Sequence, residues 1–515
     1  MARIGFDNQK YLTTQSEQIR KRIAQFGGKL YLEFGGKLFD DYHASRVLPG
    51  FEPDSKIRML QQLSDDAEIV IAINAADIEK NKVRGDLGIT YDADVLRLID
   101  TFRELNLYVG SVVMTRYTGQ ASADAFLKRL NTLGIKCYKH YNIAGYPNDV
   151  KHIVSDEGFG INDYIETTRP LVIVTAPGPG SGKMATCLSQ LYHEHKRGIS
   201  AGYAKFETFP VWNLPLKHPV NLAYEAATAD LNDVNMIDPF HLEVYGEKAV
   251  NYNRDVEIFP VLNATFVKIH GHSPYQSPTD MGVNMVGSCI VDDEAARYAS
   301  AQEVIARYYT ALCDYKMGKI SHKTVEKLKY IIGLMQLTPS EDRPCVRPAL
   351  EKHEMTGKNC VAYELCDGTI ITGKASDIMS ATSSATVNAI KYLSGIPDHI
   401  KLIPAEVLVP MLKLKREVLG SRTSALKLDD VLLALTVSMA TNPMVEQALN
   451  QLPNLRGTDL HSSVMLRTGD VSTLKKLGVR VTCEDKFPEN SLSFSLNIIT
   501  EFLQSRYISG LFFCL

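Results

Sequence analysis

The chain of 515 residues has little of what marks nucleic-acid-binding, secreted or membrane proteins. Its formal net charge is −3, so it has no basic excess for a nucleic acid or an anionic membrane. No uninterrupted apolar run approaches the ~20 residues that span a bilayer. The opening MARIGFDNQKYLTTQSEQIRKR has no apolar core of a signal peptide. These absences predict a cytoplasmic protein without nucleic-acid or membrane partners.

Cysteine is also sparse. The nine cysteines are odd in number and irregularly spaced, which favours free, mostly buried thiols in a reducing compartment. The closest cluster, Cys345, Cys360 and Cys366, contains no CxxC pair and therefore argues against a zinc ribbon. The apolar closing stretch IITEFLQSRYISGLFFCL matches poorly with the polar CEDKFPENS before it, and no function is placed on it.

Apolar runs alternate with amphipathic stretches in the first half of the chain. The strand candidates are KLYLEF (29–34), AEIVIAIN (67–74), YVGSVVMTRY (108–117), IKCYKHYNI (135–143) and RPLVIVTAP (169–177). Between them, segments such as DADVLRLIDTFRELN (92–106) place apolar residues on one helical face. This alternation predicts βαβ units and a mostly parallel sheet that helices cover on both faces.

The composition and patterning favour a multidomain α/β protein. We expect an α/β domain at 1–225, a mainly helical domain at 226–344 and a smaller C-terminal α/β domain at 345–515. In the last, NCVAYELCDGTIITGKAS predicts two strands around a turn, and SSVMLRTGDVSTLKKLGVRVTCE predicts a strand–helix–strand unit. The stretch DGTIITGKASDIMSATSSATVNAIKYL faintly resembles the first strand and helix of the cytidine-deaminase fold, but the H-x-E and P-C-x-x-C zinc signature of that fold is absent.

The most informative stretch is LVIVTAPGPGSGKMATCLSQLYHEHKRG, at 171–198. A buried strand ends in a turn where Gly178, Gly180 and Gly182 let backbone N–H groups approach an anion. Lys183 then opens an amphipathic helix whose positive dipole end points to the same place. The predicted phosphate-binding residues are Gly178, Gly180, Ser181, Gly182, Lys183 and Thr186.

This loop resembles the phosphate loop of P-loop nucleoside kinases. Gly180–Lys183 match that pattern, and the resemblance implies that the lysine holds phosphate. The first glycine of GxxxxGK[ST], however, falls on Pro177, and the Mg²⁺-binding hydroxyl falls on Met184 and Ala185. We therefore expect bound phosphate, from a nucleotide or another metabolite, with Mg²⁺ in doubt; the alternative is a glycine-rich turn without a ligand.

A second candidate site lies in KIHGHSPYQSPTDMGVNMVGSCIVDDE, at 268–294. On a strand, His270 and His272 would face the same side and converge on a metal or a phosphate. Asp280 follows in a loop and is a candidate acid or base. The predicted catalytic residues are therefore His270, His272 and Asp280, and the alternative is two histidines in ordinary backbone hydrogen bonds.

Basic residues follow the first two predicted strands. Loops at the carboxyl ends of adjacent parallel strands converge, so these residues are candidates for binding an anionic substrate near Lys183. They are Lys37, Arg46, Lys82 and Arg84. The alternative is that each is a solvated loop charge.

Four stretches together are similar to the bacterial family known as domain of unknown function 1846. They are EFGGKLFDDYHASRVLPGF, APGPGSGKMATCLSQLYHE, SPTDMGVN and GDVSTLKKLGVRVT. The resemblance extends to about Asp485 and implies a bacterial cytosolic multidomain protein, without implying an activity.

The residues favour a protein that binds a small phosphorylated molecule, as a phosphotransferase, ligase or hydrolase. A non-catalytic sensor or scaffold and a metal-dependent hydrolase without nucleotide are the alternatives, and homo-oligomerisation is left open.

Overall fold

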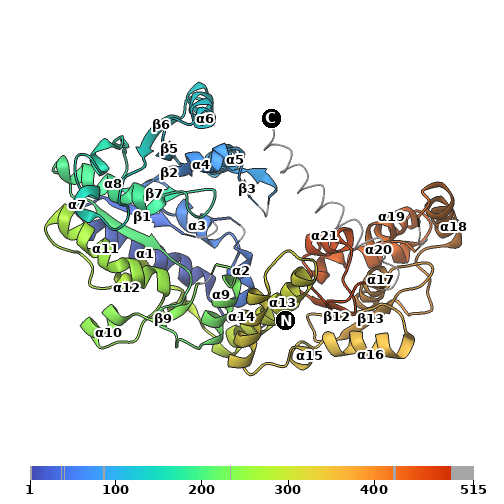
Figure 1. The fold of residues 1–515 in the computed structure, drawn as a ribbon. Helices are drawn as coiled ribbons and strands as arrows, with labels where there is room; N and C mark the ends of the chain where they lie inside the picture. Colours follow the sequence, from blue (N-terminus) through green and yellow to red (C-terminus); the bar gives the residue numbers. More distant parts are fainter. Residues whose placement is uncertain are drawn as a thin grey trace. The chain divides into compact units, whose positions relative to one another are not determined.

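The computed structural model describes residues 3–35, 38–39, 41–84, 87–231, 233–421 and 425–488. Contacts divide the chain into a first unit, Ile4–Ser300, and a C-terminal unit that begins at Ala301. In Figure 1 the first unit runs from blue to yellow-green and the C-terminal unit from yellow to red. The apolar closing stretch lies outside the described residues.

The first unit is built on a seven-stranded sheet in the order β11-β8-β1-β7-β2-β5-β6, and every neighbouring pair is parallel (Figure 1). The strands are β1 (Leu30–Phe34), β2 (Ala67–Asn74), β5 (Val109–Tyr117), β6 (Lys136–Tyr141), β7 (Leu171–Thr175), β8 (Gly202–Phe206) and β11 (Gly282–Val283). The predicted parallel α/β sheet is confirmed, and β8 and β11 extend it beyond the five strand candidates.

Helices cover the two faces of this sheet according to the direction of each crossover. From β1 the chain moves toward β6 through α2 (Tyr42–Val47), α3 (Ser55–Gln61), α5 (Tyr91–Glu104) and α6 (Ala121–Thr132). From β7 it moves the other way, through α8 (Lys183–Lys196) and then α11 (Asn253–His270). Right-handed crossovers in opposite directions place these two groups on opposite faces.

The side chains of alternate strand residues pack against the two helical layers. Tyr31, Val172 and Val174 pack with Leu188 of α8 and Phe266 of α11 in one core cluster. Residues of the other parity are equally buried and form the opposite core, as a parallel sheet covered on both faces requires.

The remaining elements of the first unit are short, apart from α1. They are α1 (Asn8–Gln25), α4 (Ala75–Glu79), β3 (Val83–Arg84), β4 (Ile89–Thr90), α7 (Val150–Ile153), η1 (Phe159–Ile161), α9 (Pro219–Ala227), β9 (Asn235–Ile237), α10 (Pro239–Tyr245), β10 (Val250–Tyr252), α12 (Pro278–Met281) and η2 (Val286–Cys289). Residues 226–300, which we expected in a helical domain, contribute α11 and β11 to this unit.

The C-terminal unit contains a separate four-stranded sheet in the order β13-β12-β14-β15. Its strands are β12 (Cys360–Glu364), β13 (Ile370–Lys374), β14 (Asp459–Ser462) and β15 (Arg480–Cys483). Its helices are α14 (His322–Leu334), α15 (Pro339–Asp342), α16 (Val346–Thr356), α17 (Ala381–Leu393), α18 (Ala405–Lys413), η3 (Leu414–Val418), α19 (Leu428–Ser438), α20 (Pro443–Leu449), η4 (Leu452–Leu455) and α21 (Thr468–Lys476); α13 (Asp293–Lys316) spans the division. The predicted C-terminal α/β unit is confirmed.

The eight cysteines among the described residues are free thiols, and four of them are buried.

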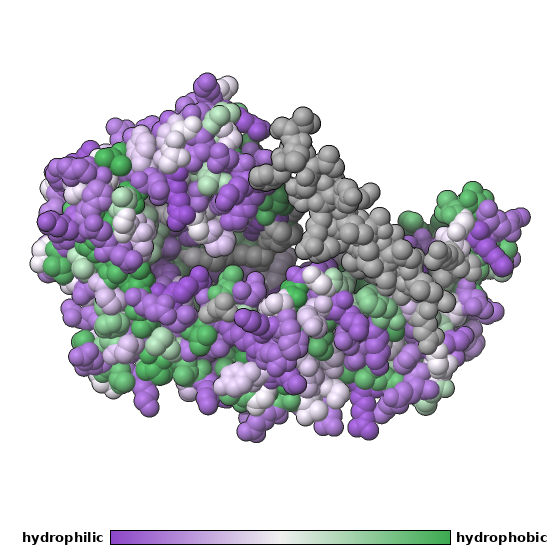
Figure 2. All heavy atoms as spheres, in the orientation of Figure 1, coloured by the Kyte–Doolittle hydropathy of each residue, from purple (hydrophilic) through white to green (hydrophobic). Residues whose placement is uncertain are grey.

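On the C-terminal unit, exposed apolar side chains gather on α18, on η3 and just after it, where Val409, Val418 and Leu419 face solvent (Figure 2). Within the described residues, no helix is both long and apolar enough to cross a bilayer.

Candidate functional site

A cavity of about 620 Å³ in the first unit opens at the carboxyl ends of the sheet strands. Its lining includes Glu33 and Gly35 at the end of β1, Thr115 and Arg116 in β5, Pro179–Thr186 in the loop and α8, Lys205 in β8, and Tyr252, Arg254 and Asp255 where β10 meets α11. The neighbours β1 and β7 send the chain in opposite directions, so this is the topological switch point of the sheet. Open parallel sheets bind ligands at such a point.

The N-terminus of α8 faces this cavity without a side-chain cap. Gly182 is the N-cap residue, in the left-handed region with φ +87°, and the first helical bond runs from the N–H of Thr186 to its carbonyl at 2.9 Å. The N–H groups of Lys183, Met184 and Ala185 therefore lack intrahelical acceptors. Together with the helix dipole they form a cradle suited to an anion.

The glycine-rich loop is held in shape by its own neighbours. Thr115 Oγ1 donates to the carbonyl of Ser181 at 2.8 Å, and Ser181 Oγ donates to the carbonyl of Gly178 at 2.9 Å. A Cβ on Gly178 would collide with the Tyr91 hydroxyl, whereas one on Gly180 would meet open space. The Ser181 hydroxyl, predicted as a phosphate ligand, is thus used to close the loop.

Thr186 supplies an independent indication of a ligand. Its side chain is fully buried and lines the cavity, yet Oγ1 has no hydrogen-bond partner among the described residues. Buried hydroxyls are normally paired, because an unpaired one forfeits its bonds to water. A ligand oxygen in the cavity would satisfy it.

Cationic side chains outnumber carboxylates around the cavity. Lys183 is half-buried, and the described residues include no ion-pair partner for it. Arg116 has φ +51° at an irregularity in β5, a conformation that non-glycine residues adopt rarely. The cations are Arg116, Lys183, Lys205 and Arg254, and the carboxylates are Glu33 and Asp255. Arg254 pairs with Asp233 at 2.7 Å, and Lys205 pairs with Asp255. The positive charge available to an anionic ligand is therefore that of Arg116 and Lys183.

Opposite the cradle, Lys205 is the centre of a buried polar cluster. Its ammonium group contacts Asp255 and the Tyr252 hydroxyl, and lies 3.3 Å from Glu207 Oε1. Burial alone would lower the pKa of Lys205, but the neighbouring acidic groups outweigh it and raise that pKa well above its usual value. Burial raises the pKa of the Glu207 carboxyl to about 7, against the opposing effect of Lys205.

His140 contributes a neutral imidazole to the wall of the cavity. Burial lowers its pKa to about 4, and Nε2 donates to the carbonyl of Asp163 at 3.1 Å when the ring is neutral. At neutral pH this ring carries no charge and leaves Nδ1 as an acceptor.

The predicted catalytic histidines, His270 and His272, do not lie near the cradle. His270 is the last residue of α11 and His272 follows the helix-ending Gly271, so the expected strand geometry is wrong. The His270 ring lies 5.8 Å from that of His195, near the end of α8. His195 is twelve residues beyond Lys183, or about 18 Å along the helix axis.

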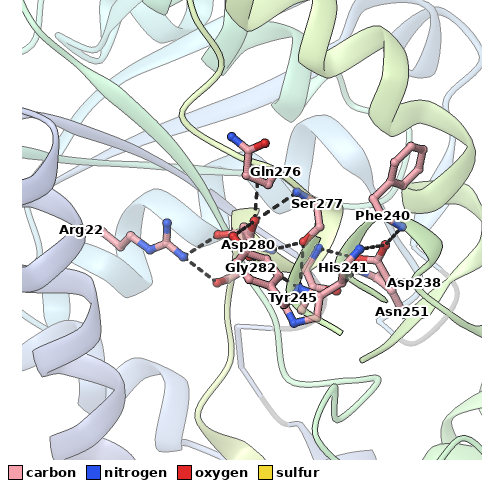
Figure 3. Close-up of polar contacts among 11 residues, drawn as sticks. Arg22, Asp238, Phe240, His241, Tyr245, Asn251, Gln276, Ser277, Asp280 and Gly282 are labelled. Atoms are coloured by element: carbon pink, nitrogen blue, oxygen red, sulfur yellow. Dashed lines mark hydrogen bonds and ion pairs between the residues drawn. The ribbon is translucent and has the colours of Figure 1, made fainter. Parts of the chain in front are cut away.

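Asp280 has a structural role in this part of the chain (Figure 3). Its Oδ2 accepts from the backbone N–H groups of Gln276 and Ser277, both at 3.1 Å, and from the Tyr245 hydroxyl at 3.0 Å. Its own N–H donates to Ser277 Oγ at 3.2 Å, which completes a capping box on α12. Asp280 is absent from the lining of the 620 Å³ cavity, although its neighbour Met281 is part of it.

A second carboxylate ties the same segment to α10. Asp238 caps α10 through the N–H groups of Phe240 and His241, at 3.0 and 3.1 Å (Figure 3). Its other oxygen accepts from the Thr279 hydroxyl at 2.6 Å. Both aspartates of this region are thereby engaged in holding backbone.

The predicted basic residues separate into different positions. Lys37 lies outside the described residues. Lys82 pairs with Asp77 at 3.3 Å and lies over the ring of Tyr91, which itself contacts Gly178. Arg84 pairs with the buried Asp94 at 2.8 Å. Arg46 lies on α2, and none of these three lines the cavity.

No group of three or more histidine, cysteine or acidic side chains within the described ranges is placed to share a metal ion.

The C-terminal unit has its own cavity, of about 550 Å³, near the N-termini of α17, α19 and α21. Its Asp470 accepts from the N–H of Leu428 at 3.1 Å, and Ser380 caps α17.

Sequence reasoning missed the wall opposite the cradle. Lys205 belongs to GYAKF, a five-residue strand that was not among the strand candidates. Tyr252 ends β10 and Asp255 lies in the first turn of α11, within the segment expected to be mainly helical, but neither residue was singled out as a site residue. The signal for β8 was its short apolar alternation after the glycine that ends α8.

Comparison with known proteins assigns the chain to a family. The profile described as "Domain of unknown function DUF1846, N-terminal" matches residues 4–336, and the corresponding C-terminal profile matches residues 341–493. A UPF0371 protein of Streptococcus thermophilus is 55% identical over 96% of this chain and 99% of its own length. A UPF0371 protein of Streptococcus pneumoniae is 54% identical over the same shares. The chain belongs to the DUF1846 family, as the sequence motifs predicted.

Proposed function

We propose that this protein binds a phosphorylated small molecule in the 620 Å³ cavity, with the phosphate in the cradle at the start of α8. The observation that carries the proposal is the uncapped helix N-terminus at the switch point of a parallel sheet. Lys183 adds a cation at the same place, and the unpaired hydroxyl of Thr186 adds a donor.

The surroundings of the cradle favour phosphate without a P-loop magnesium ion. Met184 and Ala185 stand where a P-loop has its metal-binding hydroxyl, and Thr186 follows only two residues after Met184. We therefore expect binding that does not depend on Mg²⁺. Arg116 and Lys183 supply the electrostatic attraction instead.

Isothermal titration with inorganic phosphate tests this proposal. Lys183→Ala removes a charged hydrogen bond worth about 1.5–3 kcal/mol, so affinity should fall roughly tenfold to hundredfold. Lys196→Ala is the matched control, because Lys196 lies at the other end of the same helix and pairs with Asp156 at 2.8 Å.

Thr186→Val sharpens the same test. The substitution removes a hydroxyl that has no protein partner, so it should weaken phosphate binding without lowering the stability of the free protein. Phosphate binding that is undetectable, or equal in the wild type and Lys183→Ala, would refute the proposal.

A further inference from the structure

The wall opposite the cradle defines what the rest of the ligand must offer. Lys205 contacts Asp255 and Tyr252, while Glu33 Oε2 accepts from the Tyr203 hydroxyl at 2.7 Å. All five residues line the same cavity as the α8 N-terminus. The cluster therefore combines carboxylate acceptors, an ammonium donor and phenolic hydroxyls around one space.

The sheet register sets the distance between this wall and the cradle. Lys205 of β8 is paired with Glu33 of β1, and Glu33 is paired with Val174 of β7. The loop leaves β7 just beyond Val174, at Thr175. Two strand spacings, about 10 Å, thus separate the backbone at Lys205 from the strand that carries the cradle.

The polar groups of the wall determine which chemical groups a ligand of about 10 Å must carry at the end away from its phosphate. The ammonium group of Lys205 has three N–H donors, and Asp255, Tyr252 and Glu207 already surround it as acceptors. The carboxylates of Glu33 and Asp255 each accept one hydrogen bond in this wall and keep lone pairs for a ligand donor. A second anionic group would meet these two carboxylates, and an apolar body would leave their remaining lone pairs without a donor. Vicinal hydroxyls are neutral donors and suit both carboxylates.

We propose that the ligand is a phosphorylated polyhydroxy compound of sugar-phosphate type, whose hydroxyls donate to Glu33 and Asp255. This inference rests on the proposed function, because the cradle must hold the phosphate. It assigns to these two residues a direct role in ligand specificity, while Lys205 holds Asp255 in position.

The test compares glucose 6-phosphate, inorganic phosphate, glucose and ATP by isothermal titration of the full chain. Glucose 6-phosphate should bind at least roughly a hundredfold more tightly than phosphate, since each of two added charged hydrogen bonds gives about tenfold or more. Glu33→Gln and Asp255→Asn keep the side-chain shapes and should reduce this ratio roughly tenfold, with phosphate affinity unchanged. Lys183→Ala should weaken both ligands alike.

The outcomes separate the two proposals. If inorganic phosphate binds but glucose 6-phosphate gains nothing over it, or if ATP is preferred, the sugar-phosphate inference is overturned and the cradle stands. An unchanged ratio in both Glu33→Gln and Asp255→Asn has the same meaning. If no phosphate compound binds, the proposed function itself fails.

Discussion

Gly180 and Gly182 have the same kind of backbone conformation in very different surroundings. Their φ angles are +74° and +87°, in the region that L-residues other than glycine rarely adopt. A Cβ on Gly180 would meet nothing within 4 Å, but one on Gly182 would lie 3.0–3.1 Å from the Thr115 side chain. The Thr115 hydroxyl donates to the carbonyl of Ser181, so moving this side chain away from a new Cβ would break that hydrogen bond.

This difference predicts unequal costs for two alanine substitutions. Gly180→Ala should lower the free energy of unfolding by about 1–2 kcal/mol, from backbone strain alone. Gly182→Ala should cost roughly 1–3 kcal/mol more, because crowding at Thr115 is added to the strain. Urea denaturation of both variants measures the difference, and equal costs would show that Thr115 does not brace the loop.

At this scale the local turn was easier to predict than the wall. Glycines and a lysine directly after an apolar strand have a local geometry that their order alone specifies, which is why the turn and the helix start at Lys183 were predictable. Phosphate binding by these residues stays a prediction. Lys205 and Asp255 are fifty residues apart, and their ion pair depends on how β8 and α11 pack. The role predicted for Asp280 depended likewise on a loop that the structure shows to be a capped helical turn.

Among the elements, the edge strand β6 is joined to the segment after η1 by hydrogen bonds that include one from a buried imidazole, His140. His140 bonds to the carbonyl of Asp163, and Asn162 Oδ1 accepts from the N–H of Tyr141 at 2.8 Å. These bonds hold the segment after η1 against the edge strand of the sheet. Burial lowers the pKa of His140 to about 4, whereas an unfolded histidine titrates near 6.5.

Folding stability should therefore depend on pH in a definite direction. Between pH 6.5 and 4 the unfolded chain binds a proton at His140 that the folded chain refuses, so this stabilising contribution is present above pH 6.5 and is lost as the pH falls. From pH 7 to pH 5 it amounts to about 2 kcal/mol. The difference in unfolding free energy between the wild type and His140→Gln should shrink by that amount at pH 5. A difference that does not change with pH would contradict this account.

Strands of largely apolar sequence were predictable, while interrupted elements were not. β2 and β7 are wholly buried, and their sequences AEIVIAIN and LVIVT are largely apolar. β8 has five residues like β7, but Lys205 interrupts its apolar pattern. α11 contains Pro260, which breaks the usual helical pattern, and the strand geometry expected for His270 was wrong although the surrounding segment was expected to be mainly helical.

For the molecule as a whole, the candidate site is a property of the first unit. The strands that flank the switch point, β1 and β7, are far apart in sequence and adjacent in the sheet. The lining residues run from Glu33 to Met281, entirely within Ile4–Ser300. The family match across both units identifies relatives, and the geometry of this one cavity supplies the functional hypothesis.

A crystal soaked with phosphate tests the central claim most directly. The account predicts density for the anion within hydrogen-bonding distance of the backbone N–H groups of Lys183, Met184 and Ala185, with the Lys183 ammonium turned toward it. The same soak of Lys183→Ala should give weaker density at that position. An empty cradle at saturating phosphate, or an anion bound only elsewhere on the protein, would contradict it.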